Sequence, residues 1–248
     1  MLEFSFVNFR SNVLHYFPQR SNRGKFMRSV KLVAVIGLSL LSSAVWAADL
    51  NIKPKDFVDI KTVAPEVIVE ARYFGDHNFV GTKIDGYNAP KCLLTKKAAE
   101  ALKGVQSELA PFGLTLHIYD CYRPQMAVDH FAKWAGDIKD TKTKKEFYPD
   151  IDKNNLFKDG YIALKSSHSR GATADLTIDG LDMGTPFDLF GPLSNTINGK
   201  TNAKARANRL LLKTLMEKYG FKNLKEEWWH YTLIKEPHPK TYYNFAVE

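Results

Sequence analysis

The spacing of apolar residues along the chain predicts a sequence of helices and strands. Apolar residues three and four positions apart, separated by polar ones, indicate amphipathic helices. Short runs rich in β-branched and aromatic residues that alternate with polar positions indicate half-buried strands. By these criteria helices are expected over 94–113, 123–136 and 202–220, and strands over 114–120, 172–178 and 227–234.

The segments between these elements are polar or rich in turn-forming residues. A loop-rich region over 48–92 contains one short strand-like run, 66–74, and further loops are expected over 137–160 and up to residue 200. No internal repeat or Pro/Gly/Ser linker divides the chain, so one domain is expected. Helices and strands do not alternate regularly, which favours an α+β fold with a central antiparallel sheet flanked by helices.

The N-terminal part of the chain has the features of a secretory signal peptide. Met27 is followed by basic residues, then by an apolar run over 32–41 and the small residue Ala47. We predict a signal peptide over 1–47, cleaved near Ala47, with residues 1–26 a long basic region or sequence upstream of the true start. The apolar run is shorter than the about 20 residues that span a bilayer, although an uncleaved anchor is the alternative. The expected mature domain is 48–248, without a stable membrane span.

Removal of the predicted leader changes the charge of the protein. The whole chain has 35 Lys and Arg against 27 Asp and Glu, a formal net charge of +8. The mature part keeps 29 basic and 26 acidic residues, a net charge of +3. The basic character therefore belongs mostly to the leader, and a nucleic-acid partner is not expected.

Both cysteines of the chain, Cys92 and Cys121, lie in the mature part. In an exported protein an even pair suggests one disulfide, which closes a loop of about 30 residues and stabilises the fold by about 3–4 kcal/mol. A zinc site built from two cysteines is less favoured because the sequence has no CxxC motif.

Two imidazoles and one carboxylate occur in a pattern that suits a hydrolytic zinc site. The segment "SSHSRGATADLTI" contains His168 and Asp175, and "EEWWHY" contains His230. Catalytic zinc sites take three such protein ligands and leave a fourth position for water. Gly171 allows the chain to turn between the first two, so that both can face one ion. We therefore predict one Zn²⁺ per chain, bound by His168, Asp175 and His230.

Two further residues suit the acid–base chemistry and charge stabilisation of peptide hydrolysis. Glu227, three residues before His230, is a candidate general base for the attacking water. Residues three apart point to opposite faces of a regular strand, so Glu227 is expected where the strand begins or at an irregularity. Arg123, in "YDCYRPQ" at a strand-to-helix junction, suits a donor to the developing oxyanion. A lone histidine or E-x-x-H pair is a weak signal, but SxHxxGxxAD followed by ExWH is specific.

These motifs carry a resemblance to a known family. "SSHSRGATADLT", "EWWHY" and "DCYRPQ" resemble the zinc D-alanyl-D-alanine dipeptidases of the vancomycin-resistance type, over nearly the whole mature chain. The wider group includes zinc D-Ala-D-Ala carboxypeptidases and shares a metal core with Hedgehog and lysostaphin-like domains. The resemblance implies hydrolysis of the small dipeptide D-Ala-D-Ala to free D-alanine, with the metal-ligand, base and arginine roles given above.

The resemblance also implies two substrate-binding residues, and the features that depart from it indicate a cellular location. Ser166 matches a serine beside the first ligand that helps to hold the substrate, and Asp188 in "MGTPFDLF" matches an acidic residue near the substrate's ammonium group. The export signal and the cysteines differ from the cytoplasmic resistance enzymes and indicate work in the periplasm. Two other functions stay open: a zinc D,D-carboxypeptidase or endopeptidase that acts on peptidoglycan stem peptides, and a non-catalytic module that keeps zinc as a structural element.

Overall fold

Five strands form the sheet at the centre of the protein. The computed structural model describes residues 50–248, and the predicted signal peptide lies outside them. The strand order is β2-β4-β5-β7-β6, and the strands are β2 (Ile68–Val69), β4 (Leu116–Asp120), β5 (Thr173–Ile178), β7 (His230–Leu233) and β6 (Phe221–Asn223). Neighbouring strands are antiparallel except for β2 and β4, which are parallel. The predicted antiparallel sheet is therefore correct for four strands, with one short parallel strand added at its edge.

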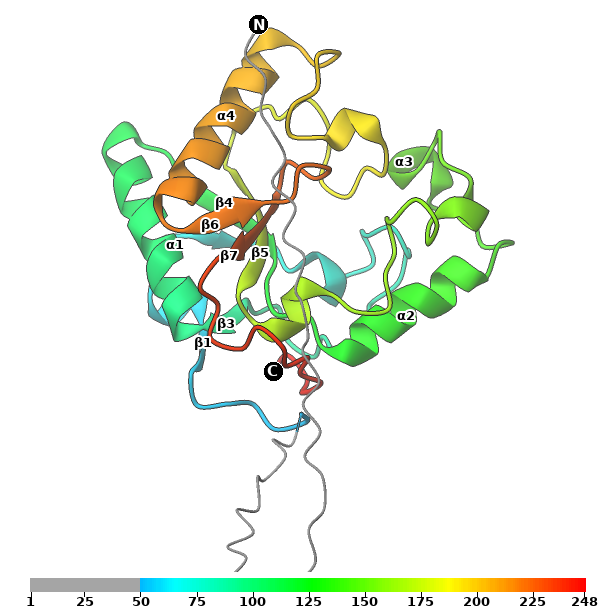
Figure 1. Cartoon of the computed structure of the whole chain (residues 1–248), viewed down its shortest axis with the longest axis horizontal. Helices are drawn as coiled ribbons and strands as arrows, with labels where there is room; N and C mark the ends of the chain where they lie inside the picture. The colour runs from blue at the N-terminus through cyan, green and yellow to red at the C-terminus, as the bar shows by residue number, and fades with distance from the viewer. Residues whose placement is uncertain (1–49) are drawn as a thin grey trace, which may run out of the picture. The chain divides into compact units, whose positions relative to one another are not determined.

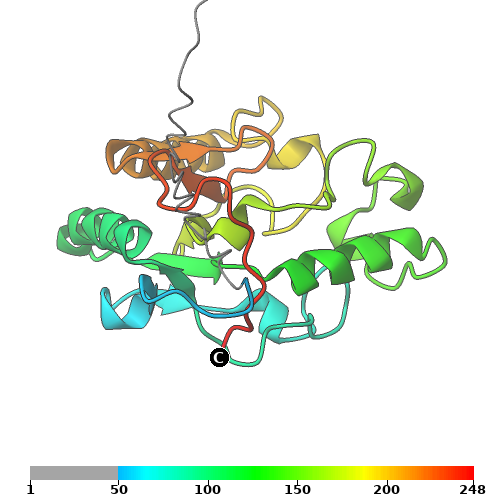
Figure 2. The same ribbon diagram turned by 60° about the horizontal axis from the view of Figure 1, so that its bottom comes forward.

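Two long helices lie together on one side of this sheet. Helices α1 (Lys96–Leu109) and α4 (Ala203–Lys218) contact each other and lie side by side in both views (Figures 1 and 2). Their apolar faces and the sheet enclose the first hydrophobic core, whose fully buried members include Leu102, Val105, Ile118, Leu176 and Leu212. Strand β5 is buried along its whole length, so Asp175 sits inside this framework rather than at the surface.

A second core, rich in aromatic residues, lies around helix α2 (Gln125–Gly136), on the opposite side of the sheet from α1 (Figure 1). Rings from distant parts of the chain meet there, among them those of Tyr73, Phe79, Phe131, Trp134 and Phe245. The C-terminal segment contributes to this core, and Val247 forms an isolated parallel bridge with Tyr87. The second core supports the wall of the cavity described below.

Several predicted boundaries differ from the structure for local reasons. The first helix begins at Lys96 rather than at residue 94, because β3 (Leu93–Thr95) pairs antiparallel with β1 (Phe57–Asp59) in a separate two-stranded sheet. The strand-like run 66–74 forms only β2 before a 3-10 turn. The predicted loop 137–160 contains the one-turn helix α3 (Lys144–Phe147).

The last predicted strand is shorter than its apolar pattern suggests. Strand β7 begins at His230, so residues 227–229 of the predicted strand lie in the turn that precedes it. This agrees with the expectation that Glu227 lies where the strand begins. Within residues 50–248 no helix is long and apolar enough to cross a membrane.

Candidate metal centre

The sheet and one short turn bring the three predicted metal ligands together. His168 lies in a 3-10 turn, Ser167–Arg170, directly before β5, and Asp175 lies within β5. His230 is the first residue of β7, and the β5–β7 pairing places it directly opposite Asp175. One ligand atom from each residue lies within 4.8 Å of the other two. Residues 62 positions apart in the sequence thus converge on one point.

The arrangement of nitrogen and oxygen atoms around this point suits a divalent cation. Nε2 of His168 lies 3.3 Å from Nδ1 of His230 and 3.3 Å from a carboxylate oxygen of Asp175. Nδ1 of His230 lies 3.1 Å from the other oxygen of Asp175. A set of two imidazole nitrogens and one carboxylate is typical of catalytic zinc sites.

The hydrogen bond on the far side of the His168 ring selects its metal-binding tautomer, and the contact on the far side of the His230 ring is compatible with the same tautomer. Nδ1 of His168 lies 2.7 Å from the backbone carbonyl oxygen of Cys121, to which it donates. Nε2 of His230 lies 3.2 Å from the hydroxyl of Ser167. With these nitrogens protonated, the lone pairs of the other two face each other, an arrangement that repels unless a cation lies between them. The residues present therefore fit the zinc ion that the sequence predicts.

The carboxylate of Asp175 is kept ionised in this buried position. Burial by itself raises the pKa of Asp175, but positive charge on the adjacent imidazoles of His168 and His230, together with the hydrogen bonds that charged rings donate, outweighs burial and holds the pKa far below its ordinary value; a bound cation would supply positive charge at the same place. An ionised carboxylate is the form that binds a metal ion.

Gly171 provides the turn between the first two ligands. Its φ of +78° lies in the left-handed region, where a side chain is strained. A Cβ at this position would lie 2.2 Å from the ring of Phe57, so the space is also closed. The sequence expectation that this glycine directs His168 and Asp175 to one side is consistent with the observed turn.

Glu227 lies beside the cluster on the strand-entrance turn, outside the regular ladder of β7. Its Oε2 lies 3.4 Å from Nδ1 of His230, and its side chain is 29% exposed. Burial raises the pKa of the Glu227 carboxyl, with a smaller contribution from the negative charge of Asp175. A carboxylate with a raised pKa is a better proton acceptor near neutral pH than an ordinary glutamate.

Arg123 approaches the cluster from the end of β4, where Asp120 orients it. Nε and Nη2 of Arg123 lie 2.9 Å and 2.8 Å from the same oxygen of Asp120, and Nη2 lies 3.5 Å from Asp175. The guanidinium also lies over the rings of Tyr73 and Phe131. These contacts fix a positive charge next to the candidate ligands.

A cavity of about 440 Å³ opens onto these residues, and both predicted substrate-binding residues line it. Ser166 lies at the start of the turn that carries His168, and its hydroxyl accepts a hydrogen bond from the backbone N–H of His168 at 3.3 Å. Asp188 is buried in the wall and accepts a hydrogen bond from the hydroxyl of Tyr73 at 2.9 Å. The structure thus brings every predicted site residue to one cavity except the two cysteines, which form a disulfide behind His168.

Three contributors to the site were not predicted from the sequence. Asp120 holds Arg123, Tyr73 holds Asp188, and the Cys121 carbonyl orients His168. The motif "DCYR" gave one available signal, because an acidic residue three positions before an arginine suggests a partner. The other two contacts join positions 47 or more residues apart, and one uses a backbone atom that any residue would supply.

The cavity thus contains two imidazoles and a carboxylate with a glutamate beside them, a set that is typical of metallopeptidases. Comparisons with known proteins place the chain in that class. Residues 53–248 match the peptidase M15 family profile, described as D-Ala-D-Ala dipeptidase. The chain belongs to this family.

Several curated relatives are similar in sequence to this chain along most of their own lengths. The chain is 44% identical over 185 residues to a D-alanyl-D-alanine dipeptidase of Enterococcus faecalis, covering 72% of this chain and 91% of that protein. It is 38% identical over 198 residues to one of Streptomyces coelicolor, covering 77% and 98%. It is 32% identical over 183 residues to one of Escherichia coli, covering 72% and 84%.

Solved structures show weaker likeness. The LD-carboxypeptidase LdcB aligns with a TM-score of 0.42 at 16% identity, over 76% of this chain and 72% of that one. The D,D-pentapeptidase VanY in complex with Zn(II) aligns with a TM-score of 0.37 at 12% identity, over 60% and 76%. Likeness this distant adds nothing to the family assignment.

Proposed function

We propose that this protein hydrolyses the dipeptide D-alanyl-D-alanine to two molecules of D-alanine, with one zinc ion held by His168, Asp175 and His230. The observation that carries the proposal is the convergence of these three ligand atoms within 4.8 Å beside the carboxylate of Glu227, in a chain whose curated relatives are named for this activity. A zinc ion in such a site lowers the pKa of water toward about 7 and polarises a carbonyl group.

In this proposal Glu227 moves the proton. Its carboxylate takes a proton from the attacking water and returns it to the nitrogen of the leaving D-alanine. The position on a turn at the margin of the cluster, with part of the side chain exposed to the cavity, gives the carboxylate access to both atoms. The raised pKa of Glu227 makes its protonated form easier to reach than that of an ordinary glutamate, which favours the second transfer.

Arg123 and the cavity wall have complementary roles in the proposal. The Arg123 guanidinium, oriented by Asp120, donates to the oxygen that becomes negative when water attacks the peptide carbonyl. Asp188 receives the ammonium group of the dipeptide, and Ser166 contacts the substrate beside His168. An ammonium ion next to Asp188 favours the ionised carboxylate, and a longer peptide has no ammonium group at that place.

The role of Glu227 is tested by the Glu227→Gln variant. Glutamine keeps the size of the side chain but cannot accept the proton, so kcat for D-Ala-D-Ala is expected to fall about 10²–10⁴-fold while one zinc per chain is retained. Activity is measured as release of free D-alanine, and zinc by elemental analysis. The matched control is Glu226→Gln at the exposed neighbouring position, which is expected to keep wild-type turnover. Wild-type kcat in Glu227→Gln would disprove the assigned role.

The substrate is tested with the same assay on a dipeptide and on a pentapeptide stem that ends in D-Ala-D-Ala. The proposal expects D-alanine release from the dipeptide and little from the stem. Preferential release from the stem would instead establish the D,D-carboxypeptidase function. Zinc binding with no hydrolysis of either compound would establish a structural metal module.

We also propose that the protein works in the periplasm after cleavage of its leader near Ala47. The support is the signal-peptide pattern of residues 1–47 together with the disulfide between Cys92 and Cys121, since disulfides persist in oxidising compartments.

A further inference from the structure

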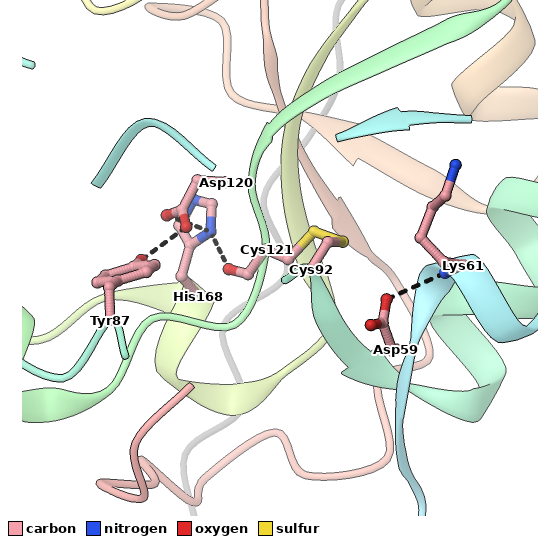
Figure 3. The surroundings of a disulfide bond; sticks show 7 residues. All are labelled: Asp59, Lys61, Tyr87, Cys92, Asp120, Cys121 and His168. Atoms are coloured by element: carbon pink, nitrogen blue, oxygen red, sulfur yellow. Dashed lines mark hydrogen bonds and ion pairs between the residues drawn. A yellow bond between two sulfur atoms is a disulfide. The ribbon is translucent and has the colours of Figure 1, made fainter. Parts of the chain in front are cut away.

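The single disulfide of the described chain lies directly behind the metal centre. It joins Cys92, which immediately precedes β3, to Cys121, which immediately follows β4, with their Cα atoms 5.2 Å apart. Both cysteines are almost completely buried. Figure 3 shows the bond between the two strands and the side chain of His168 on the other side of the Cys121 backbone.

The backbone of Cys121 contacts a candidate ligand. Its carbonyl oxygen accepts the 2.7 Å hydrogen bond from Nδ1 of His168, the bond that leaves Nε2 facing the metal position (Figure 3). The preceding residue, Asp120, orients Arg123, and its carboxylate also lies 3.4 Å from Nδ1 of His168. The segment 120–123 therefore places one ligand and one charged residue of the site together.

The sheet does not hold this segment by itself. The pairing of β4 with β5 is irregular between Ile118 and Asp120, and it ends at the pair Asp120–Asp175. Cys121 lies beyond this last pair. Strand β3 holds it through two links: the disulfide reaches Cys92, and the N–H of Tyr122 donates to the carbonyl of Leu93 at 2.9 Å. A longer hydrogen bond, from the N–H of Arg123 to the carbonyl of His168 at 3.4 Å, joins the segment to the His168 turn.

Strand β3 also contacts the turn that carries His168. The N–H of Thr95 donates to the carbonyl of Gly171 at 2.7 Å. Strand β3 thus contacts both partners of the hydrogen bond between His168 and Cys121. It contacts the turn that carries the donor, His168, and the segment that carries the acceptor, the Cys121 carbonyl. The disulfide is the covalent link between β3 and the acceptor side.

We propose that the Cys92–Cys121 disulfide positions the metal centre: it holds the Cys121 carbonyl against His168 and so sets the orientation of that ring for the metal. The inference rests on the proposed role of His168 as a ligand. Partners of this kind change metal affinity by about 10–100-fold when they are lost. A disulfide that acted only on the unfolded chain would change stability by about 3–4 kcal/mol and leave zinc affinity of the folded protein unchanged.

The test compares zinc affinity in folded proteins of similar stability. The double variant Cys92→Ala/Cys121→Ala removes the bond but keeps the Cys121 carbonyl. Leu116→Ala, in the first core at the far end of β4, serves as the matched control that destabilises the fold without touching the site. Zinc dissociation constants are measured by competition with a chromophoric chelator, at a temperature where circular dichroism shows each protein fully folded. The absorption of bound Co²⁺ reports ligand geometry in the same samples.

The proposal expects zinc affinity to fall about 10–100-fold in the double cysteine variant, with a changed Co²⁺ spectrum, and to stay at the wild-type value in Leu116→Ala. Unchanged zinc affinity in the folded cysteine variant would overturn the inference and leave the proposed function intact. If the wild-type protein binds no zinc, or if His168→Ala binds zinc as tightly as the wild type, both this inference and the proposed function are overturned. If the alanine pair does not fold, Cys92→Val/Cys121→Ala fills more of the space and is judged by the same criteria.

Discussion

Asp188 combines two costly features in one residue of the cavity wall. It is the only residue other than glycine within 50–248 that has a positive φ, at 61°, and its side chain is buried with the hydroxyl of Tyr73 as hydrogen-bond donor. Burial, and then the negative charge of Asp175, raise the pKa of Asp188 well above its ordinary value. Backbone strain and a buried acid at one position are characteristic of functional sites.

The raised pKa of Asp188 predicts a pH dependence of stability. Because the folded protein keeps this proton at pH values where the unfolded chain has lost it, the free energy of unfolding falls as pH rises from about 4 toward the raised pKa, with a slope of at most about 1.4 kcal/mol per pH unit. Asp188→Asn removes this decrease, and asparagine tolerates the left-handed backbone. Urea unfolding of the metal-free wild type and variant across this range measures the difference. If the free energy of unfolding of the wild type and of Asp188→Asn changes with pH in the same way, the pKa of Asp188 is not raised in the folded protein.

The residues of the site differ in how far the sequence could reveal them. His168, Asp175 and His230 follow from side-chain chemistry in a specific motif. Asp120 orients Arg123 and lies close to His168. It can do so only because the end of β4 lies beside β5 in the folded sheet. The Cys121 contact uses a carbonyl group that every residue has. Sequence patterns report the side chains that bind a ligand more readily than the atoms that orient them.

The turn before β5 depends on Gly171 for both backbone and space. A Gly171→Ala substitution is strained at φ +78° and also meets the ring of Phe57, so we expect a loss of about 2–5 kcal/mol in the free energy of unfolding. We also expect weaker zinc binding, because this turn sets the position of His168 relative to Asp175. Denaturant unfolding and chelator competition measure the two effects.

Gly180, in the turn after β5, provides the control for this substitution. It has φ +71° but nothing within 4 Å of an added Cβ. Gly180→Ala is therefore expected to cost only about 1–2 kcal/mol and to leave zinc affinity unchanged. Equal losses of stability and zinc affinity in the two variants would mean that Phe57 and the turn do not constrain the site.

The longer elements could be predicted because their periodic patterns are long enough to be distinctive. Helices α1, α2 and α4 and strands β4 and β5 lie within the predicted ranges. Three of their ends, at residues 120, 136 and 178, coincide with the predicted ones, and the others differ by one to four residues. Strands β1, β3 and β6 have three residues each. A strand of that length has no measurable alternation, and only its partner across the sheet defines it.

For the protein as a whole, the proposed periplasmic location and the proposed role of the disulfide together link the compartment to zinc binding. If the leader directs export, protein recovered from the periplasm is expected to begin at Ala48, to lack free thiols, and to contain one zinc per chain. A form made of residues 48–248 in a reducing cytoplasm is expected to have two free thiols and weaker zinc binding. Intact mass and thiol alkylation measure these states. Recovery of the chain from membranes with residues 1–47 attached would instead support the uncleaved anchor.

The position of β7 has a consequence for how the protein matures. This strand is the last of the sheet in sequence, yet it lies between β5 and β6 rather than at an edge, and it carries His230. A nascent chain that has passed β6 still has a gap in its sheet and only two of the three ligands. If His168, Asp175 and His230 hold the zinc as proposed, the site is complete only after the final strand has inserted, and a polypeptide that ends before His230 lacks one of its three ligands.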